Sequence, residues 1–280
     1  MKLVSFQIDD RIGFGAVAAE EIVRFDTAVG APADLKSLLA QRSKIDAAFA
    51  QSRDRVPLDR VRLLPPVPNP AKILCVATNF RDASTQGKPV AQFPLIFSRF
   101  ADSFVGHGAR LLKPAPSGKY DFEGELAVII GKPGHRIDRR HAMDHVAGYC
   151  GLNDGTARDW QKHSSQFTAG KNFYRSGSVG PWLVTADEVS DLGSLQLETR
   201  VNGVVKQSIS LDRMIFDVSW LIEYLSSFTP LAAGDVIATG TPFGFGSSRS
   251  PPEFLGVGDV VEVEITGLGT LRNAVGEDTP

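Results

Sequence analysis

The sequence predicts an α+β fold that consists mostly of short β-strands, arranged as a sandwich or a rolled sheet. Short apolar segments alternate with glycine-containing turns along most of the chain. The run Leu126–Ile130 is unbroken and ends at Gly131, which is typical of a strand buried on both faces. After residue 165, a single helix over about 214–228 is expected among the strands. Many short strands with glycine turns favour a sandwich or roll over an alternating βαβ fold.

The N-terminal part of the chain predicts a small α/β domain. Residues 1–30 alternate apolar and polar side chains between glycines, which predicts short strands. Residues 34–53 predict one helix or two short ones, because Leu35, Leu38 and Ile45 fit one helical face. The proline-rich residues 64–70 cannot continue a helix and predict a linker. We therefore expect domains over 1–65 and 66–280.

The second predicted domain has more strands than helices. A short helix plus loop is expected over 79–94, and helices are expected over 136–146, 156–163 and 214–228. The predicted strands are 72–77, 94–97, 126–130, 147–152, 183–184, 195–201, 204–207, 235–239, 259–266 and 270–275.

Composition excludes several classes of protein. The chain has 280 residues, 42% apolar and 22% charged, as in ordinary globular proteins. The net charge of −2 gives no reason to expect nucleic acid or an anionic membrane as a partner. No apolar run reaches the length of a membrane span, and the first residues predict a strand, not a signal peptide. Cys75 and Cys150 lie in apolar runs and predict buried reduced thiols, which favours a cytoplasmic protein.

Two carboxylates precede the buried strand. Glu123 and Glu125 are two residues apart, so in a strand they point to the same face. Buried like charges are costly unless a cation or donors compensate them, and a divalent metal is the simplest compensation. Glu262 and Glu264 have the same spacing, but strict alternation with valine and isoleucine predicts that they face solvent. A metal site and a solvated strand end both remain open for Glu123 and Glu125.

Other polar residues have two interpretations each. Asp154 lies where a strand ends and a helix begins, and an N-cap is its simpler interpretation. Lys171 would ordinarily be a solvated lysine, and Gln161 would ordinarily lie on a helix surface. The glycine-rich residues 239–246 lack the lysine and following helix of a phosphate-binding loop, which favours a tight turn.

Several of these segments, in this order, resemble the fumarylacetoacetate hydrolase family over about residues 70–275. The segments that carry the resemblance are Asp-Phe-Glu-Gly-Glu-Leu-Ala-Val-Ile-Ile-Gly, Val-Ala-Gly-Tyr-Cys-Gly-Leu-Asn-Asp-Gly-Thr-Ala-Arg-Asp-Trp-Gln, Gly-Lys-Asn-Phe, Gly-Pro-Trp-Leu-Val-Thr-Ala-Asp-Glu, Val-Asn-Gly, Ala-Thr-Gly-Thr-Pro and Gly-Asp-Val-Val-Glu-Val-Glu-Ile. The resemblance implies a mixed β-sandwich roll and a homodimer. It also implies a small-molecule substrate, a 2-oxo acid or a β-diketo acid such as an acylpyruvate.

The resemblance also implies roles for individual residues. Glu123, Glu125 and Asp154 match the carboxylates that bind Mg²⁺ or Mn²⁺. Lys171 matches a lysine that assists proton transfer or stabilises an enolate. Gln161 and Thr241 match substrate-contacting positions, and we expect Gln161 to take part in catalysis as well. Thr241, Arg81 and Arg99 are the expected substrate-binding residues. A metal held by three carboxylates keeps positive charge for the substrate, which suits an enolate-forming reaction.

The sequence departs from the hydrolytic members of the family. They carry a His–Glu pair in the pattern Asn-Tyr-x-x-His-x-x-Glu, whereas Ala83 and Gln86 stand at these two positions here. Neither residue can act as a general base. Arg99 replaces a family lysine and keeps its charge but not its geometry. Residues 79–94 lie at the position of the family's lid, so we expect a lid that orders on substrate binding.

Three functions follow as hypotheses. A family hydrolase would cleave a C–C bond of an acylpyruvate-like substrate. Without the His–Glu pair, decarboxylation or tautomerisation of a substrate such as oxaloacetate is expected instead, because neither needs an activated water. A catalytically weak protein that only binds a diketo acid with its metal is the alternative from a different class.

Overall fold

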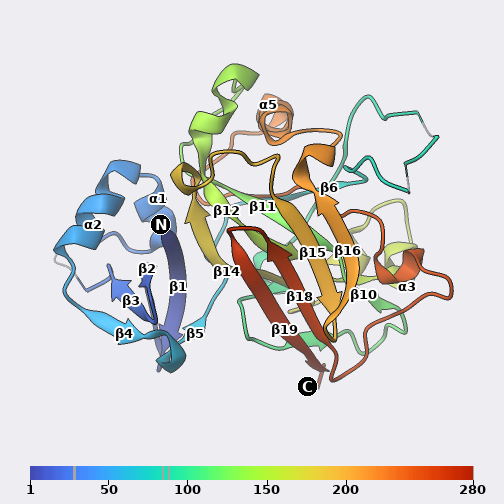
Figure 1. Ribbon diagram of the computed structural model, residues 1–280, viewed down its shortest axis with the longest axis horizontal. Helices are drawn as coiled ribbons and strands as arrows, with labels where there is room; N and C mark the ends of the chain where they lie inside the picture. Colours follow the sequence, from blue (N-terminus) through green and yellow to red (C-terminus); the bar gives the residue numbers. More distant parts are fainter. Residues whose placement is uncertain (28–29, 84, 88, 280) are drawn as a thin grey trace.

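The computed structural model describes residues 1–27, 30–83, 85–87 and 89–279. Strands dominate it, which confirms the predicted α+β, mostly β fold. Twelve strands form one mixed sheet, five form a second sheet and two form a short ribbon. Figure 1 shows the five-stranded sheet in front, helix α5 above it and the N-terminal segment, in blue, at the left.

The N-terminal segment forms strands and two short helices, as predicted. Helix α1 begins after Asp34, whose carboxylate accepts a hydrogen bond from the Ser37 amide. Strand β1 pairs with β14, so this segment continues the large sheet; the boundary between residues 65 and 66 stays a prediction. The elements are β1 Lys2–Ile8, β2 Arg11–Ala18, β3 Glu21–Arg24, α1 Leu35–Leu39, η1 Arg42–Lys44, α2 Ile45–Gln51, β4 Arg55–Pro57, η2 Leu58–Arg60 and β5 Arg62–Leu63.

The large sheet has the order β4-β3-β2-β1-β14-β12-β11-β17-β6-β7, with β5 beside β1 and β8 beside β14. Neighbours are antiparallel except β17 with β6 and β14 with β8. The strands after the N-terminal segment are β6 Ile73–Ala77, β7 Leu95–Ser98, β8 Phe104–Val105, β11 Gly124–Ile130, β12 Val146–Asn153, β14 Gly177–Thr185 and β17 Val236–Ala238.

The second sheet has the order β16-β15-β18-β19-β9, and β10 pairs with β13. Its strands and those of the ribbon are β9 Leu111–Lys113, β10 Tyr120–Asp121, β13 Thr156–Ala157, β15 Gln196–Val201, β16 Val204–Ser210, β18 Val260–Ile265 and β19 Gly269–Glu277. The remaining helices are η3 Ala101–Ser103, η4 Arg139–His145, α3 Arg158–Gln161, α4 Thr168–Lys171, η5 Ala186–Glu188, η6 Leu211–Arg213, α5 Val218–Phe228 and η7 Gly246–Ser248.

Strand β11 is buried on both faces, as its apolar run predicted. Val128 and Ile130 pack into one cluster with α5, whereas Ala127 and Ile129 pack into another with α1. In β18, by contrast, the glutamates alternate with fully buried residues and form ion pairs with Arg200 and Arg272. None of the helices in the described chain is long and apolar enough to cross a membrane.

Four predicted elements differ from the structure. The described part of 79–94 contains turns but no helix, and the predicted helix over 156–163 is β13 followed by the short α3. The helix predicted from residue 136 is the 3₁₀ helix η4, because Arg136 has a positive φ of 55° and the helix begins only after Asp138. The strand predicted at 183–184 is the longer β14, whose glycines interrupt the alternation on which the prediction relied.

Candidate active site and metal centre

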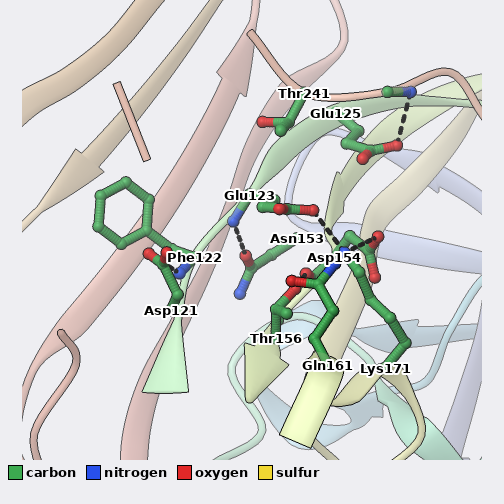
Figure 2. A network of polar contacts seen from close by, with 12 residues as sticks. Asp121, Phe122, Glu123, Glu125, Asn153, Asp154, Thr156, Gln161, Lys171 and Thr241 are labelled. Atoms are coloured by element: carbon green, nitrogen blue, oxygen red, sulfur yellow. Dashed lines mark hydrogen bonds and ion pairs between the residues drawn. The ribbon is translucent and has the colours of Figure 1, made fainter. Parts of the chain in front are cut away.

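Three acidic residues meet where β11 begins and β12 ends. Gly124 pairs with Asn153, so Glu123 and Glu125, on either side of Gly124, lie next to Asp154. The Asp154 amide donates to the Glu123 carbonyl at 2.8 Å, which fixes this meeting point. One carboxylate oxygen from each residue lies within 4.8 Å of the others, and all three residues are buried. Figure 2 shows the three side chains converging on one place.

Three basic residues surround this acidic triad. The Lys171 ammonium lies 2.5 Å from Glu123 Oε2 and 2.6 Å from Asp154 Oδ2. Arg99 Nη1 lies 2.5 Å from Asp154 Oδ1, and Arg158 Nη2 lies 2.6 Å from Glu123 Oε1. Burial raises the pKa of Asp154, but the charges of Lys171 and Arg99 outweigh it, so that this pKa lies below its ordinary value.

Glu125 is the least compensated member of the triad. Its Oε2 accepts a hydrogen bond from the Gly240 amide at 2.8 Å. Burial, followed by the charges of Asp154 and Glu123, raises the pKa of Glu125 well above its ordinary value. Three convergent carboxylates, one of them short of positive charge, form a donor set that suits a hard divalent cation. The residues present therefore fit Mg²⁺ or Mn²⁺. The family resemblance groups Asp154 with the two glutamates, whereas its local sequence pattern favours an N-cap.

A cavity of about 260 Å³ is lined by two members of the triad, Glu123 and Glu125. Gln161, Lys171 and Thr241 lie on its wall together with Glu123 and Glu125. The Thr241 hydroxyl donates to the Gly124 carbonyl at 2.9 Å, and Gln161 Oε1 accepts from Arg158 Nη1 at 3.2 Å. The rest of the wall is largely apolar: Val76, Ala77, Thr78, Phe97, Arg158, Phe167 and Phe245. The cavity wall therefore combines a few polar groups with three aromatic rings.

Two of the predicted substrate-binding residues lie elsewhere. Arg99 is buried behind Asp154 and does not line the cavity. Arg81 lines a neighbouring cavity of about 850 Å³ that shares Ala77 and Thr78 with the first. Residues 83 and 86, where the hydrolytic members have histidine and glutamate, line this second cavity too. A substrate contact by Arg81 or Arg99 stays a prediction.

Arg158 is a site residue that we did not single out from the sequence. It lies on the cavity wall, its Nε donates to Asp121 Oδ2 at 2.7 Å and its guanidinium lies 4.6 Å from the centroid of the Phe245 ring. Asp121 in turn accepts hydrogen bonds from the amides of Gly246 and Ser247. The one available signal was the position of Arg158, four residues after Asp154 in the same motif.

Comparison with known proteins agrees with this geometry. The family model "Fumarylacetoacetate (FAA) hydrolase C-terminal" matches residues 72–276, and "Rv2993c-like, N-terminal" matches residues 1–66. Oxaloacetate tautomerase YisK of Bacillus subtilis is 42% identical over 224 residues, which are 78% of this chain and 74% of YisK.

Solved structures show the same fold over the whole chain. The fumarylacetoacetate hydrolase of Exiguobacterium antarcticum is 36% identical, with a TM-score of 0.89 over 99% of both chains. The maleylpyruvate hydrolase of Sphingobium sp. SYK-6, solved with manganese(II) and pyruvate, is 28% identical, with a TM-score of 0.81 over 100% of both chains. This protein is therefore an enzyme that belongs to the fumarylacetoacetate hydrolase family.

Proposed function

We propose that this enzyme catalyses the keto–enol tautomerisation of a 2-oxo dicarboxylic acid such as oxaloacetate, with Mg²⁺ or Mn²⁺ as its cofactor. The observation that carries the proposal is the buried acidic triad, with Lys171 beside it and no ionisable base at positions 83 and 86. The name of the relative YisK, an oxaloacetate tautomerase, supports the same reaction.

Tautomerisation moves one proton between C3 and the 2-oxo oxygen, and no water molecule has to be activated. Hydrolysis does require a base beside the attacking water, and such a base typically contributes about 10²–10⁴ in rate. Ala83 has no titratable group, and the amide of Gln86 is not basic. Positions 83 and 86 therefore lack the general base that hydrolysis needs. The acidic triad and Lys171, which tautomerisation needs, are present.

The residues of the cavity have distinct roles in this proposal. A divalent ion held by Glu123, Glu125 and Asp154 would act as a Lewis acid towards the 2-oxo group. Lys171, on the cavity wall, can hold or donate the proton that is transferred. Gln161 offers an amide to a substrate oxygen, and the aromatic rings of the cavity limit access of water.

The test follows three reactions in the same preparation. Enol-oxaloacetate is added to enzyme with Mg²⁺, with Mn²⁺ or with a chelator, and the loss of enol absorbance is recorded. We expect a metal-dependent acceleration over the rate without enzyme. Pyruvate formation from oxaloacetate and cleavage of acetylpyruvate are measured in parallel. No acceleration, combined with acetylpyruvate cleavage at kcat/KM above roughly 10⁴ M⁻¹s⁻¹, would refute the proposal in favour of hydrolysis. Pyruvate formation faster than loss of enol would instead show a decarboxylase.

We also propose that the enzyme is a cytoplasmic homodimer. Cys75 and Cys150 are free and buried, as predicted, which is compatible with a reducing compartment. The homodimer rests on the family resemblance alone. The manganese in the Sphingobium structure supports a divalent ion as the cofactor.

A further inference from the structure

We propose that the Lys171 ammonium is an internal counter-ion that occupies the cation position of the triad in the metal-free enzyme, and that a divalent ion must displace it to bind. The inference rests on the metal site of the proposed function but concerns how that site is loaded. Lys171 is fully buried against two of the three proposed ligands, so it competes directly with the metal for their oxygens.

The oxygens of Glu123 and Asp154 are divided between two kinds of cation. Arg158 takes Oε1 of Glu123, and Arg99 takes Oδ1 of Asp154. Lys171 takes the remaining oxygen of each residue, Oε2 and Oδ2, and bridges them. A metal that uses one oxygen from each carboxylate has these two oxygens left to it, and they are the two that the ammonium holds.

The two arginines are fixed in place by further contacts. Arg99 also donates to the Ser103 hydroxyl, the Gly155 carbonyl and the Ser176 hydroxyl. Arg158 is held by Asp121 and packs over Phe245. A guanidinium that is held by several separate contacts cannot leave without losing all of them. Neither arginine is therefore the group that yields to a metal.

Lys171, by contrast, is held at its charged end by fewer contacts and borders the cavity. Among the described residues, its two hydrogen bonds go to the triad, and its Nζ lies 4.9 Å from the centroid of the Phe97 ring. The side chain lies on the cavity wall, so a change of rotamer turns the ammonium into the cavity and away from the triad. An ammonium is a compact charge on a flexible stem, which makes this exchange feasible.

Charge balance favours the exchange. Among the buried groups at this centre, four carboxylates face three cations: Asp121, Glu123, Glu125 and Asp154 against Arg99, Arg158 and Lys171. A divalent ion in place of the ammonium compensates Glu125, which the ammonium does not contact. Metal and ammonium together between the same two oxygens would place like charges side by side, which is unfavourable.

The test is a calorimetric titration of Mn²⁺ and of Mg²⁺ into metal-free enzyme at pH 8. Lys171→Met keeps the length of the side chain and removes the competitor, so we expect it to bind both ions at least about tenfold more tightly than wild type. Lys162→Met removes a positive charge from an exposed position next to Gln161 and is the matched control; we expect its affinity to stay within about twofold. Equal or weaker binding by Lys171→Met would overturn the inference.

A second measurement does not depend on the folding of the variant. Lys171 is the one buried lysine in the part of the chain that the structure describes, so its ammonium should give a ¹⁵N signal protected from solvent exchange in labelled enzyme. Saturating Mg²⁺ should remove that protection. Persistent protection in enzyme that calorimetry shows to be loaded would overturn the displacement. Neither measurement uses a substrate, so a negative tautomerase assay and a failed displacement are told apart.

Discussion

Gly124, between two of the proposed metal ligands, packs closely against Thr199 of β15 in the second sheet. A Cβ placed on Gly124 would lie 1.9 Å from the Thr199 hydroxyl of β15 and 3.2 Å from the Thr199 Cβ. Both distances are shorter than ordinary van der Waals contact, and the first requires a movement of the backbone or of Thr199. Gly124→Ala would therefore overpack this part of the core, and the Thr199 side chain is the group in the way.

The expected change in the free energy of unfolding follows from this contact and from the chemistry of Thr199. Overpacking a filled core typically costs about 1–3 kcal/mol, and the lower backbone entropy of alanine in the unfolded chain offsets about 0.4–1 kcal/mol of it. The buried Thr199 hydroxyl has no hydrogen-bond partner among the described residues, so its loss in Thr199→Ala is nearly neutral. The methyl group lost with it costs about 1 kcal/mol. Without coupling, the double variant would lose the sum of the stability losses of the two single variants.

We expect strong coupling between the two substitutions, because Thr199→Ala removes the obstacle. The double variant should be no less stable than Gly124→Ala, which corresponds to a favourable coupling of about 1 kcal/mol or more. Denaturant unfolding of the four proteins in the presence of a chelator measures this cycle without a contribution from bound metal. Additive losses within about 0.5 kcal/mol would refute the steric reasoning.

Four further outcomes are expected. Glu125→Gln should weaken Mn²⁺ binding by more than about tenfold in a calorimetric titration. Glu262→Gln, from the pair with the same spacing in β18, is the control and should leave the affinity unchanged. Equal affinities of the two variants would contradict the proposed metal site. Burial raises the pKa of Cys150 to about 12 and raises that of Cys75 well above its ordinary value, so both thiols should resist a thiolate-specific reagent at pH 8 in native enzyme and react after denaturation. Fast labelling of the native enzyme would contradict the burial of both thiols. Hydrogen exchange should be slow at Asn79, because its amide side chain binds backbone groups of residues 216 and 239. Exchange should be faster in the described residues from 80 to 94, and it should slow when Mg²⁺ and oxalate are added. Ser84 and Lys88 lie outside the described residues. Uniformly slow exchange without ligand would count against a lid. Light scattering at micromolar concentration should report a dimer, and a monomer would disprove the homodimer.

The strand pattern of the fold could be predicted from the sequence because it is local. The run Leu126–Ile130 is apolar at every position, and β11 is buried on both faces. The alternation around Glu262 likewise indicated a half-buried strand, which β18 is. Where glycines interrupt the alternation, as in β14, the strand was predicted too short. The left-handed backbone conformation of residue 136 could not be predicted, because an arginine stands there and not the glycine or asparagine typical of that conformation.

The candidate site was predictable only in part. The spacing of Glu123 and Glu125 indicated paired carboxylates, since two residues on one strand need no tertiary information. Asp154 joins them only through the pairing of β11 with β12, and the residues alone favoured an N-cap. Arg99 reaches Asp154 across 55 residues, a contact that no local pattern encodes. For the same reason the sequence could not show that Lys171 contacts the triad itself.

The pairing of β1 with β14 has a consequence for handling the protein. Lys2 and Leu3 lie opposite Val184 and Leu183, and the amide of Thr185 donates to the carbonyl of Met1. A chain shortened to begin at residue 66 would keep the family's catalytic segment but leave this end of β14 with unpaired backbone groups and uncovered apolar side chains. Open edges of this kind recruit strands from other molecules. We therefore expect the shortened protein to precipitate where the full chain stays in solution.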